Sequence, residues 1–301
     1  MELGRRIHPL LLIAPIVLAT TSLARLQPSR ADDLPERVAF ESADNKTSLM
    51  GYLFKPAPLP AVRVPAVVMM HGRGGAYSTL AKGKYDAWTL AQLHQMWGRL
   101  WARRGYVALL VDGFGPRGYP QGFSLGSYRS RPTEVDEVTV RPLDAYGALA
   151  YLRSRPDVQA DRIGLQGWSN GASAALAAMS FDAPGIIAPA PSTGFRAAIA
   201  FYPGCGLKRR FEGGYHPYAA VRVYQGTADE EVSPRRCQML VEKSRGQGGD
   251  IDIRLYDGAT HGFDSPVLRR QGVPANVAAA ADALAEAKGF FAHQLEGQAS
   301  Q

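Results

Sequence analysis

The chain has 301 residues, of which 46% are hydrophobic and 20% are charged, and its formal net charge is +7. This composition is typical of a globular enzyme and excludes a disordered chain or a membrane protein with many spans, while the length allows a sizeable core within one domain. Basic residues are scattered among acidic ones, so nucleic-acid binding, which needs a clustered basic face, is not expected.

The N-terminal residues have the pattern of an export signal. Paired arginines at positions 5 and 6 precede an apolar run that begins at Leu10, and small residues follow. The pattern predicts a signal peptide over residues 1–31, with cleavage after Ala24 or Ala31. An uncleaved membrane anchor remains an alternative, and the general and the twin-arginine export routes are both open.

Cleavage would leave a single domain over residues 32–301. It would remove four arginines and one glutamate, so the net charge would fall from +7 to +4. We expect this domain to be periplasmic or secreted and to have no membrane attachment.

Eight short segments have the apolar or alternating pattern of strands, and from the third onward they alternate with helical patterns. Such alternation predicts an α/β fold with a mostly parallel central sheet and helices on both faces. The strands are expected at 37–41, 49–54, 65–70, 106–111, 162–166, 197–202, 220–226 and 251–256. The helices are expected at 90–104, 141–154, 170–180, 234–246 and 275–294.

The turn after the third strand is rich in glycine and consists of residues His71-Gly72-Arg73-Gly74-Gly75. Such a turn allows backbone N–H groups to converge on a developing negative charge, so the Arg73 N–H is a candidate oxyanion donor. A nucleotide site is not expected, because Tyr77 replaces the third glycine of G-x-G-x-x-G and the chain has no Walker lysine.

Two long connections, 76–89 and 113–136, are expected to shape a substrate pocket, because irregular segments of this length are usually functional or disordered. The second could present an aromatic wall with cationic points to an acidic or aromatic ester. The alternative is that its arginines are solvated or paired with nearby carboxylates, as surface charges usually are. The residues concerned are Arg117, Arg129 and Arg131 on one side and Glu134, Asp136 and Glu137 on the other.

The sequence Gly167-Trp168-Ser169-Asn170-Gly171 lies between an apolar strand and an alanine-rich helical run. A G-x-S-x-G turn in this context places the serine hydroxyl over the end of a sheet, at a helix N-terminus. Ser169 is therefore the candidate nucleophile, and the N–H of Asn170 is the second candidate oxyanion donor. A serine in a glycine-rich turn can also be only a turn residue or an N-cap, so a base and an acid must be found elsewhere.

In hydrolases with a G-x-S-x-G nucleophile turn, the acid and then the histidine follow the serine in the chain. Among the six histidines, His261 lies in a loop beyond the last strand and is the predicted base. His216 comes too early in the chain to follow a strand that carries the acid. His293 lies in a helical pattern and is expected on the helix surface. His71 precedes the nucleophile and is expected to be structural.

Asp229 follows the seventh strand and is the predicted acid, which would accept a hydrogen bond from His261 Nδ1 and fix the tautomer of the ring. Glu230 and Glu231 are the local competitors. All three carboxylates could instead favour the dipole of the helix that begins near Ser233.

These segments resemble the α/β-hydrolase superfamily and, within it, the dienelactone hydrolase-like family. The resemblance spans most of the chain after residue 40 and lies in Met69–Gly75, Leu110–Gly118, Arg162–Gly171 and Ala200–Cys205. It implies the α/β-hydrolase fold and a carboxylic ester hydrolase. The namesake enzymes of the family use a cysteine where this chain has Ser169, which moves the expected substrate from dienelactones toward the esters of serine esterases.

The chain has two cysteines, Cys205 and Cys237, and export would place them in a compartment that permits a disulfide. The elements that carry them are sequential neighbours in this fold, so we expect a disulfide that braces the loop of Asp229. Two free buried thiols are the alternative.

Together these features predict an exported serine hydrolase that cleaves a small-molecule carboxylic ester through Ser169, His261, Asp229 and an acyl-enzyme. The histidines and cysteines show no close metal-ligand spacing, so no metal site and no cofactor are expected. A peptidase or acyltransferase on the same triad, cleavage of carbon–carbon bonds, and a non-catalytic ligand-binding protein are the alternatives. The sequence specifies no oligomeric state.

Overall fold

The computed structural model describes residues 34–296 and Met1. Apart from Met1, the predicted signal peptide lies outside the described residues. Within the described part of the chain, no helix is both long enough and apolar enough to cross a bilayer.

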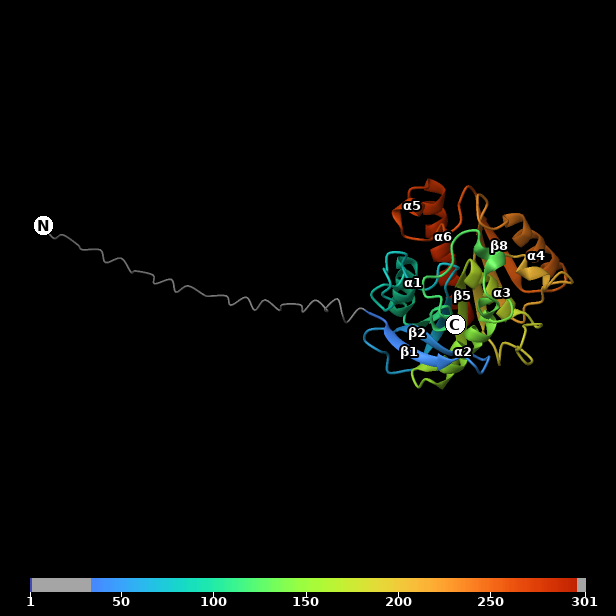
Figure 1. Ribbon diagram of the computed structural model, residues 1–301. Coiled ribbons are helices and arrows are strands. Elements are labelled where there is room, and N and C mark those ends of the chain that lie inside the picture. The colour runs from blue at the N-terminus through green and yellow to red at the C-terminus, as the bar shows by residue number, and fades with distance from the viewer. Residues whose placement is uncertain (2–33, 297–301) are drawn as a thin grey trace. The chain divides into compact units, whose positions relative to one another are not determined.

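The eight predicted strands and the five predicted helices are all present (Figure 1). The strands are β1 (Glu36–Glu41), β2 (Ser48–Phe54), β3 (Val64–Met70), β4 (Val107–Asp112), β5 (Val158–Trp168), β6 (Ala197–Phe201), β7 (Ala220–Gly226) and β8 (Ile251–Tyr256). The helices are α1 (Gln92–Arg103), α2 (Arg141–Ser154), α3 (Asn170–Met179), α4 (Pro234–Gly246), α5 (Leu268–Gln271) and α6 (Pro274–Phe291). Short helix α5 was not predicted, and the last predicted helix ends at Phe291, before a π-helical turn.

The strands form one sheet in the order β1-β2-β4-β3-β5-β6-β7-β8. The pairs β1–β2 and β2–β4 are antiparallel, and the other five pairs are parallel. The sheet is therefore mostly parallel, as predicted, and the sites of such sheets lie beyond the carboxyl ends of the strands.

Both faces of the sheet are covered by helices, which the alternation of side chains along β3 shows clearly. Ala66, Val68 and Met70 pack in a core with residues of α2, α3 and α4. Val67 and Met69 point the other way, into a core that includes Trp97 and Trp101 of α1 and three alanines of α6. The central strands are buried on both faces, which explains their continuous apolar sequences.

Candidate active site

The turn between β5 and α3 has the geometry predicted for a nucleophile turn. Ser169 has φ 52° and ψ −116°, a backbone conformation that non-glycine residues rarely adopt. A Cβ on Gly167 would lie 2.2 Å from the Gly171 oxygen, and one on Gly171 would lie 2.1 Å from the Met70 oxygen. Both glycines of the motif are therefore required by close backbone approach, and the turn is packed directly against the end of β3.

The three predicted catalytic side chains lie together, each on a loop after a parallel strand. His261 Nε2 is 3.0 Å from Ser169 Oγ, and His261 Nδ1 is 2.9 Å and 3.1 Å from the two carboxylate oxygens of Asp229. The side chains of His261 and Asp229 are 7% and 0% exposed. This arrangement suits a ring that donates its Nδ1 proton to Asp229 and accepts the hydroxyl proton at Nε2.

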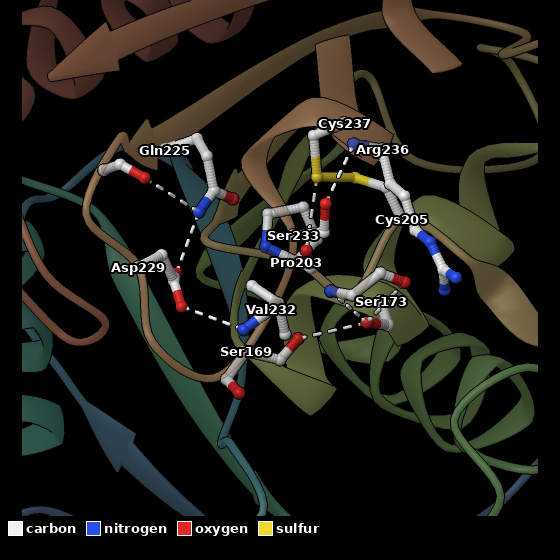
Figure 2. Close-up of a disulfide and its surroundings, with 12 residues drawn as sticks. Ser169, Ser173, Pro203, Cys205, Gln225, Asp229, Val232, Ser233, Arg236 and Cys237 are labelled. Atoms are coloured by element: carbon white, nitrogen blue, oxygen red, sulfur yellow. Dashed lines mark hydrogen bonds between the residues drawn. A yellow bond between two sulfur atoms is a disulfide. The ribbon is translucent and has the colours of Figure 1, made fainter. Parts of the chain in front are cut away.

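Hydrogen bonds on its other side hold the Asp229 carboxylate in place. Gln225 Nε2 donates to one oxygen at 2.8 Å, and the backbone N–H of Val232 donates to the other at 2.9 Å (Figure 2). The backbone N–H of Glu231 donates to that second oxygen too, at 2.9 Å. Neither neighbouring glutamate takes this position at Nδ1. Glu230 accepts the backbone N–H of His261 at 2.9 Å, and Glu231 binds the guanidinium of Arg73.

The predicted oxyanion turn lies against the nucleophile. A Cβ on Gly72 would be 3.2 Å from the Trp168 oxygen and 3.4 Å from the Ser169 Cβ, so the turn lies in close contact with the serine. Asn170 is the first residue of α3, and such an N–H has no acceptor within its helix. In the region from 34 to 296, the N–H groups of Arg73 and Asn170 donate to no acceptor in the turns, loops or side chains.

His71 has the structural environment that its place in the sequence predicted. The side chain is completely buried; Nδ1 donates to the Gly72 oxygen at 2.7 Å, and Nε2 accepts the Gly113 N–H at 3.3 Å. Burial lowers the pKa of His71 well below its usual value, and the charge of Arg141 acts in the same direction. A neutral ring with both nitrogens hydrogen-bonded holds the two loops together.

Two pockets of about 450 and 420 Å³ meet at Ser169, and Arg73 and Glu231 line both of them. As predicted, the two long connections contribute to the walls: Leu80 lines the smaller pocket, and Tyr128 lines the larger one. A hollow of about 510 Å³ lies over β1 and β2 but does not reach Ser169. The two pockets that contain Ser169 are therefore the candidates for the site, because size alone does not identify a reactive pocket.

Arg117 fits neither of the two alternatives for the second long connection, since it lines neither pocket at Ser169 and is neither solvated nor paired with Glu134, Asp136 or Glu137. Its guanidinium forms two hydrogen bonds of 2.8 Å to the buried Asp144 and lies 3.3 Å from Asp44. These partners come from α2 and from the turn after β1, which the local sequence does not reveal. Arg131 lies over the ring of Tyr128 and lines the larger pocket, and Arg129 is exposed.

The sequence analysis missed a buried carboxylate below the site. Asp264 accepts hydrogen bonds from Trp97 and Trp168 at 2.9 Å each and from Tyr202 at 2.7 Å. Burial raises the pKa of Asp264, although these hydrogen bonds favour the charged form. The Tyr202 ring centroid lies 4.6 Å from that of His261. The sequence shows only that an aspartate lies three residues after the predicted base, and it does not show that this aspartate is buried.

A second buried network, also missed, supports the residue after the nucleophile. The fully buried Arg141 donates to Asn170 Oδ1 at 2.6 Å, and Asn170 Nδ2 donates to Glu137 at 3.1 Å. Burial lowers the pKa of Arg141 to about 10. The two contacts fix the Asn170 side chain at the start of α3.

The predicted disulfide between Cys205 and Cys237 is present. Cys205 lies in the loop after β6, and Cys237 lies in α4, which follows the Asp229 loop (Figure 2). The N–H of Gly204 donates to Ser173 Oγ of α3 at 2.9 Å. The disulfide therefore links the helix after the Asp229 loop to a loop that is itself bonded to α3.

Within residues 34–296, no group of three or more histidine, cysteine, aspartate or glutamate side chains could hold a metal ion.

Comparison with known proteins identifies the family of the chain. Residues 49–295 match the dienelactone hydrolase family. The chain belongs to the dienelactone hydrolase family. The match covers most of the sequence and confirms the resemblance inferred from the motifs, and membership makes the chain a carboxylic ester hydrolase.

Solved structures show the same fold at low sequence identity. Esterase 2 of Thermogutta terrifontis phosphorylated by paraoxon is 22% identical, with a TM-score of 0.58 over 84% of this chain and 94% of that one. A dienelactone hydrolase-like promiscuous phosphotriesterase from metagenomic libraries is 17% identical, with a TM-score of 0.60 over 87% and 99%. These neighbours establish the α/β-hydrolase fold of the chain.

Human dipeptidyl peptidase 8 is 31% identical over 149 residues, which are 48% of this chain and 15% of that protein. The mouse protein matches over the same length at 30% identity. The chain thus corresponds to a small part of these curated relatives.

Proposed function

We propose that the protein hydrolyses small-molecule carboxylic esters with Ser169 as nucleophile, His261 as general base and Asp229 as the acid that orients the histidine. The contact of 3.0 Å between Ser169 Oγ and His261 Nε2 is the observation that carries this proposal. It lies within the range for direct proton transfer, and the strained backbone of Ser169 is typical of a functional turn.

In the first step, Ser169 Oγ attacks the ester carbonyl while its proton moves to His261 Nε2. The negative charge on the carbonyl oxygen would be stabilised by the N–H groups of Arg73 and Asn170. The alcohol then leaves with the proton from Nε2, and an acyl-enzyme remains. Water attacks the acyl-enzyme with His261 again as base, which regenerates the serine.

We also propose that the enzyme is exported as a domain that follows a cleaved signal peptide over residues 1–31. The disulfide between Cys205 and Cys237 supports this, because disulfides persist in oxidising compartments. N-terminal sequencing of protein recovered from the culture medium or the periplasm tests the proposal. A start after Ala24 or Ala31 is expected, and an intact Met1 in the mature protein contradicts cleavage.

The test of the reaction is hydrolysis of short-chain p-nitrophenyl esters by the purified protein, with Ser169→Ala in parallel and a serine-reactive phosphonate to label the nucleophile. We expect turnover that Ser169→Ala abolishes and a label on Ser169. A folded protein with neither activity nor label contradicts the proposal and favours a ligand-binding role.

The partial match to dipeptidyl peptidase 8 gives a second candidate function, a peptidase on the same three residues. The same preparation is assayed with peptide p-nitroanilides alongside the esters. Faster turnover of the peptide substrates, lost in Ser169→Ala, would assign the site to peptide bonds instead.

A further inference from the structure

A second carboxylate lies near His261, on the side of the ring that faces the nucleophile. Glu231 Oε2 is 3.6 Å from His261 Nε2, while Asp229 contacts Nδ1 on the opposite side of the ring. Each ring nitrogen is therefore close to a carboxylate, although a triad mechanism requires only one.

The position and the charge of Glu231 are both fixed by its surroundings. Arg73 Nε and a terminal nitrogen of the same guanidinium each donate to one Glu231 oxygen at 2.9 Å, and the glutamate side chain is only 9% exposed. Burial opposes ionisation, but the Arg73 hydrogen bonds and the neighbouring positive groups hold the pKa of Glu231 below its ordinary value. Glu231 is thus an ionised, immobile group next to Nε2.

We propose that Glu231 is a positioning residue of the hydrolytic reaction, whose carboxylate stabilises the imidazolium that His261 forms on taking the Ser169 proton. The proposal rests on the function proposed above. In that step the Ser169 O–H bond breaks, an Nε2–H bond forms, and the serine oxygen bonds to the ester carbon. Glu231 takes no part in the bonds that break or form, and in this role it acts through His261.

The other charged and titratable groups around His261 determine the size of the effect. They are Asp229 at Nδ1, Glu230 at the backbone N–H, the Tyr202 ring, Arg270 at 3.9 Å from Glu231, and Arg73. An opposite charge within about 4–6 Å usually shifts the pKa of a group by about 1–3 in the direction that favours its charged form. The Arg73 guanidinium opposes this effect, so Glu231 should stabilise the imidazolium less than a lone carboxylate at the same distance would.

The proposal is tested by the pH profile of kcat/KM for p-nitrophenyl acetate with Glu231→Gln, which keeps the shape of the side chain and removes its charge. Without the carboxylate, the acid-side midpoint should move to lower pH by about 0.5–1 unit, and the plateau should fall about three- to tenfold. The two profiles should converge at acid pH. There the reaction starts from the protonated His261 ring, and the substitution removes the same stabilisation from that ring and from the transition state. A structural defect would lower kcat/KM by one factor at every pH.

Arg73→Gln provides the opposite perturbation, because it removes the charge that counteracts Glu231 and leaves the backbone N–H in place. Its midpoint should move to higher pH. Glu212→Gln, at an exposed glutamate paired with Arg209, is the matched control and should leave the profile unchanged. Melting temperatures verify that each variant is folded, and the pH dependence of phosphonate labelling of Ser169 replaces turnover if a variant is slow.

An unmoved midpoint in a folded Glu231→Gln, or a midpoint that moves to higher pH in that variant, would overturn the role of Glu231. Failure of the proposed function has a different signature, since the unmodified enzyme would then show neither ester turnover nor labelling at Ser169.

Discussion

Removal of the disulfide should cost a large part of the stability of the domain. The bond between Cys205 and Cys237 closes a loop with a sequence separation of 32 residues. In the chain-entropy treatment a loop of this length restricts the unfolded chain by about 3.7 kcal/mol at 25 °C. Serine at both positions should therefore lower the free energy of unfolding by about 3–4 kcal/mol, because both cysteines are buried and two hydroxyl groups gain no stabilisation there.

Urea unfolding followed by fluorescence measures this difference, and a domain of this size should also lose roughly 7–15 °C in melting temperature. Reduction of the unmodified protein under denaturing conditions, followed by refolding with reductant present, should reproduce the loss. A double-serine protein within about 1 kcal/mol of the original would refute the entropic reasoning. The same protein should also lose esterase activity at temperatures below its unfolding transition, because the bond braces the loop that carries Asp229.

Three further predictions follow from individual contacts. Gly171→Ala places a Cβ 2.1 Å from a carbonyl oxygen at the end of β3 and should lower the free energy of unfolding by about 3 kcal/mol or more. Gly289→Ala, in open space on α6, should instead raise it by about 0.5–1 kcal/mol, and urea unfolding compares the two variants. Asp264→Ala leaves three buried donors unpaired and should cost on the order of 3 kcal/mol, with Asp264→Asn closer to the original protein in melting temperature. Burial opposes ionisation of Glu230, but the hydrogen bonds from Arg270 and the His261 N–H outweigh it and lower the pKa of Glu230 to about 2. The ionised side chain therefore stabilises the folded protein fully above about pH 5, and this contribution is lost as the pH falls toward 2. Because that side chain is half exposed, the loss should stay below about 1 kcal/mol, and Glu230→Gln should abolish it in unfolding curves at pH 7 and pH 3.

The sequence was sufficient to predict the fold and the three residues at the centre of the site. Ser169, Asp229 and His261 follow β5, β7 and β8, strands whose apolar pattern is plain. These strands run parallel in the sheet, with β6 between β5 and β7. Parallel order brings the carboxyl ends of strands to one edge of the sheet, so local patterns were enough to place distant residues together. The cysteines were predicted to pair for the same reason, because each belongs to a loop or helix that follows one of these strands.

Ion pairs and buried polar groups could not be predicted in the same way. Arg117 was expected to pair with carboxylates nearby in the sequence, but its partner Asp144 lies 27 residues away on α2. Asp264 and Arg141 are polar residues that a hydrophobic pattern cannot assign to the interior. Their partners, an indole or an amide on another element, are set by packing after the sheet has formed, and the local sequence contains no record of them.

The contacts that the sequence did not reveal hold the loops of the site in register. The sheet fixes the ends of its strands, but each proposed catalytic side chain lies on a loop beyond such an end, where the backbone is free to move unless other contacts restrain it. The Arg73–Glu231 ion pair joins the loop after β3 to the loop after β7, and the bond from Gly204 to Ser173 joins the loop after β6 to the nucleophile helix. The ion pair thus connects the proposed oxyanion donor to the loop of the proposed acid. A displacement of either loop would disturb both the hydrogen bond to His261 and the binding of the oxyanion, so these restraints matter for catalysis as well as for stability.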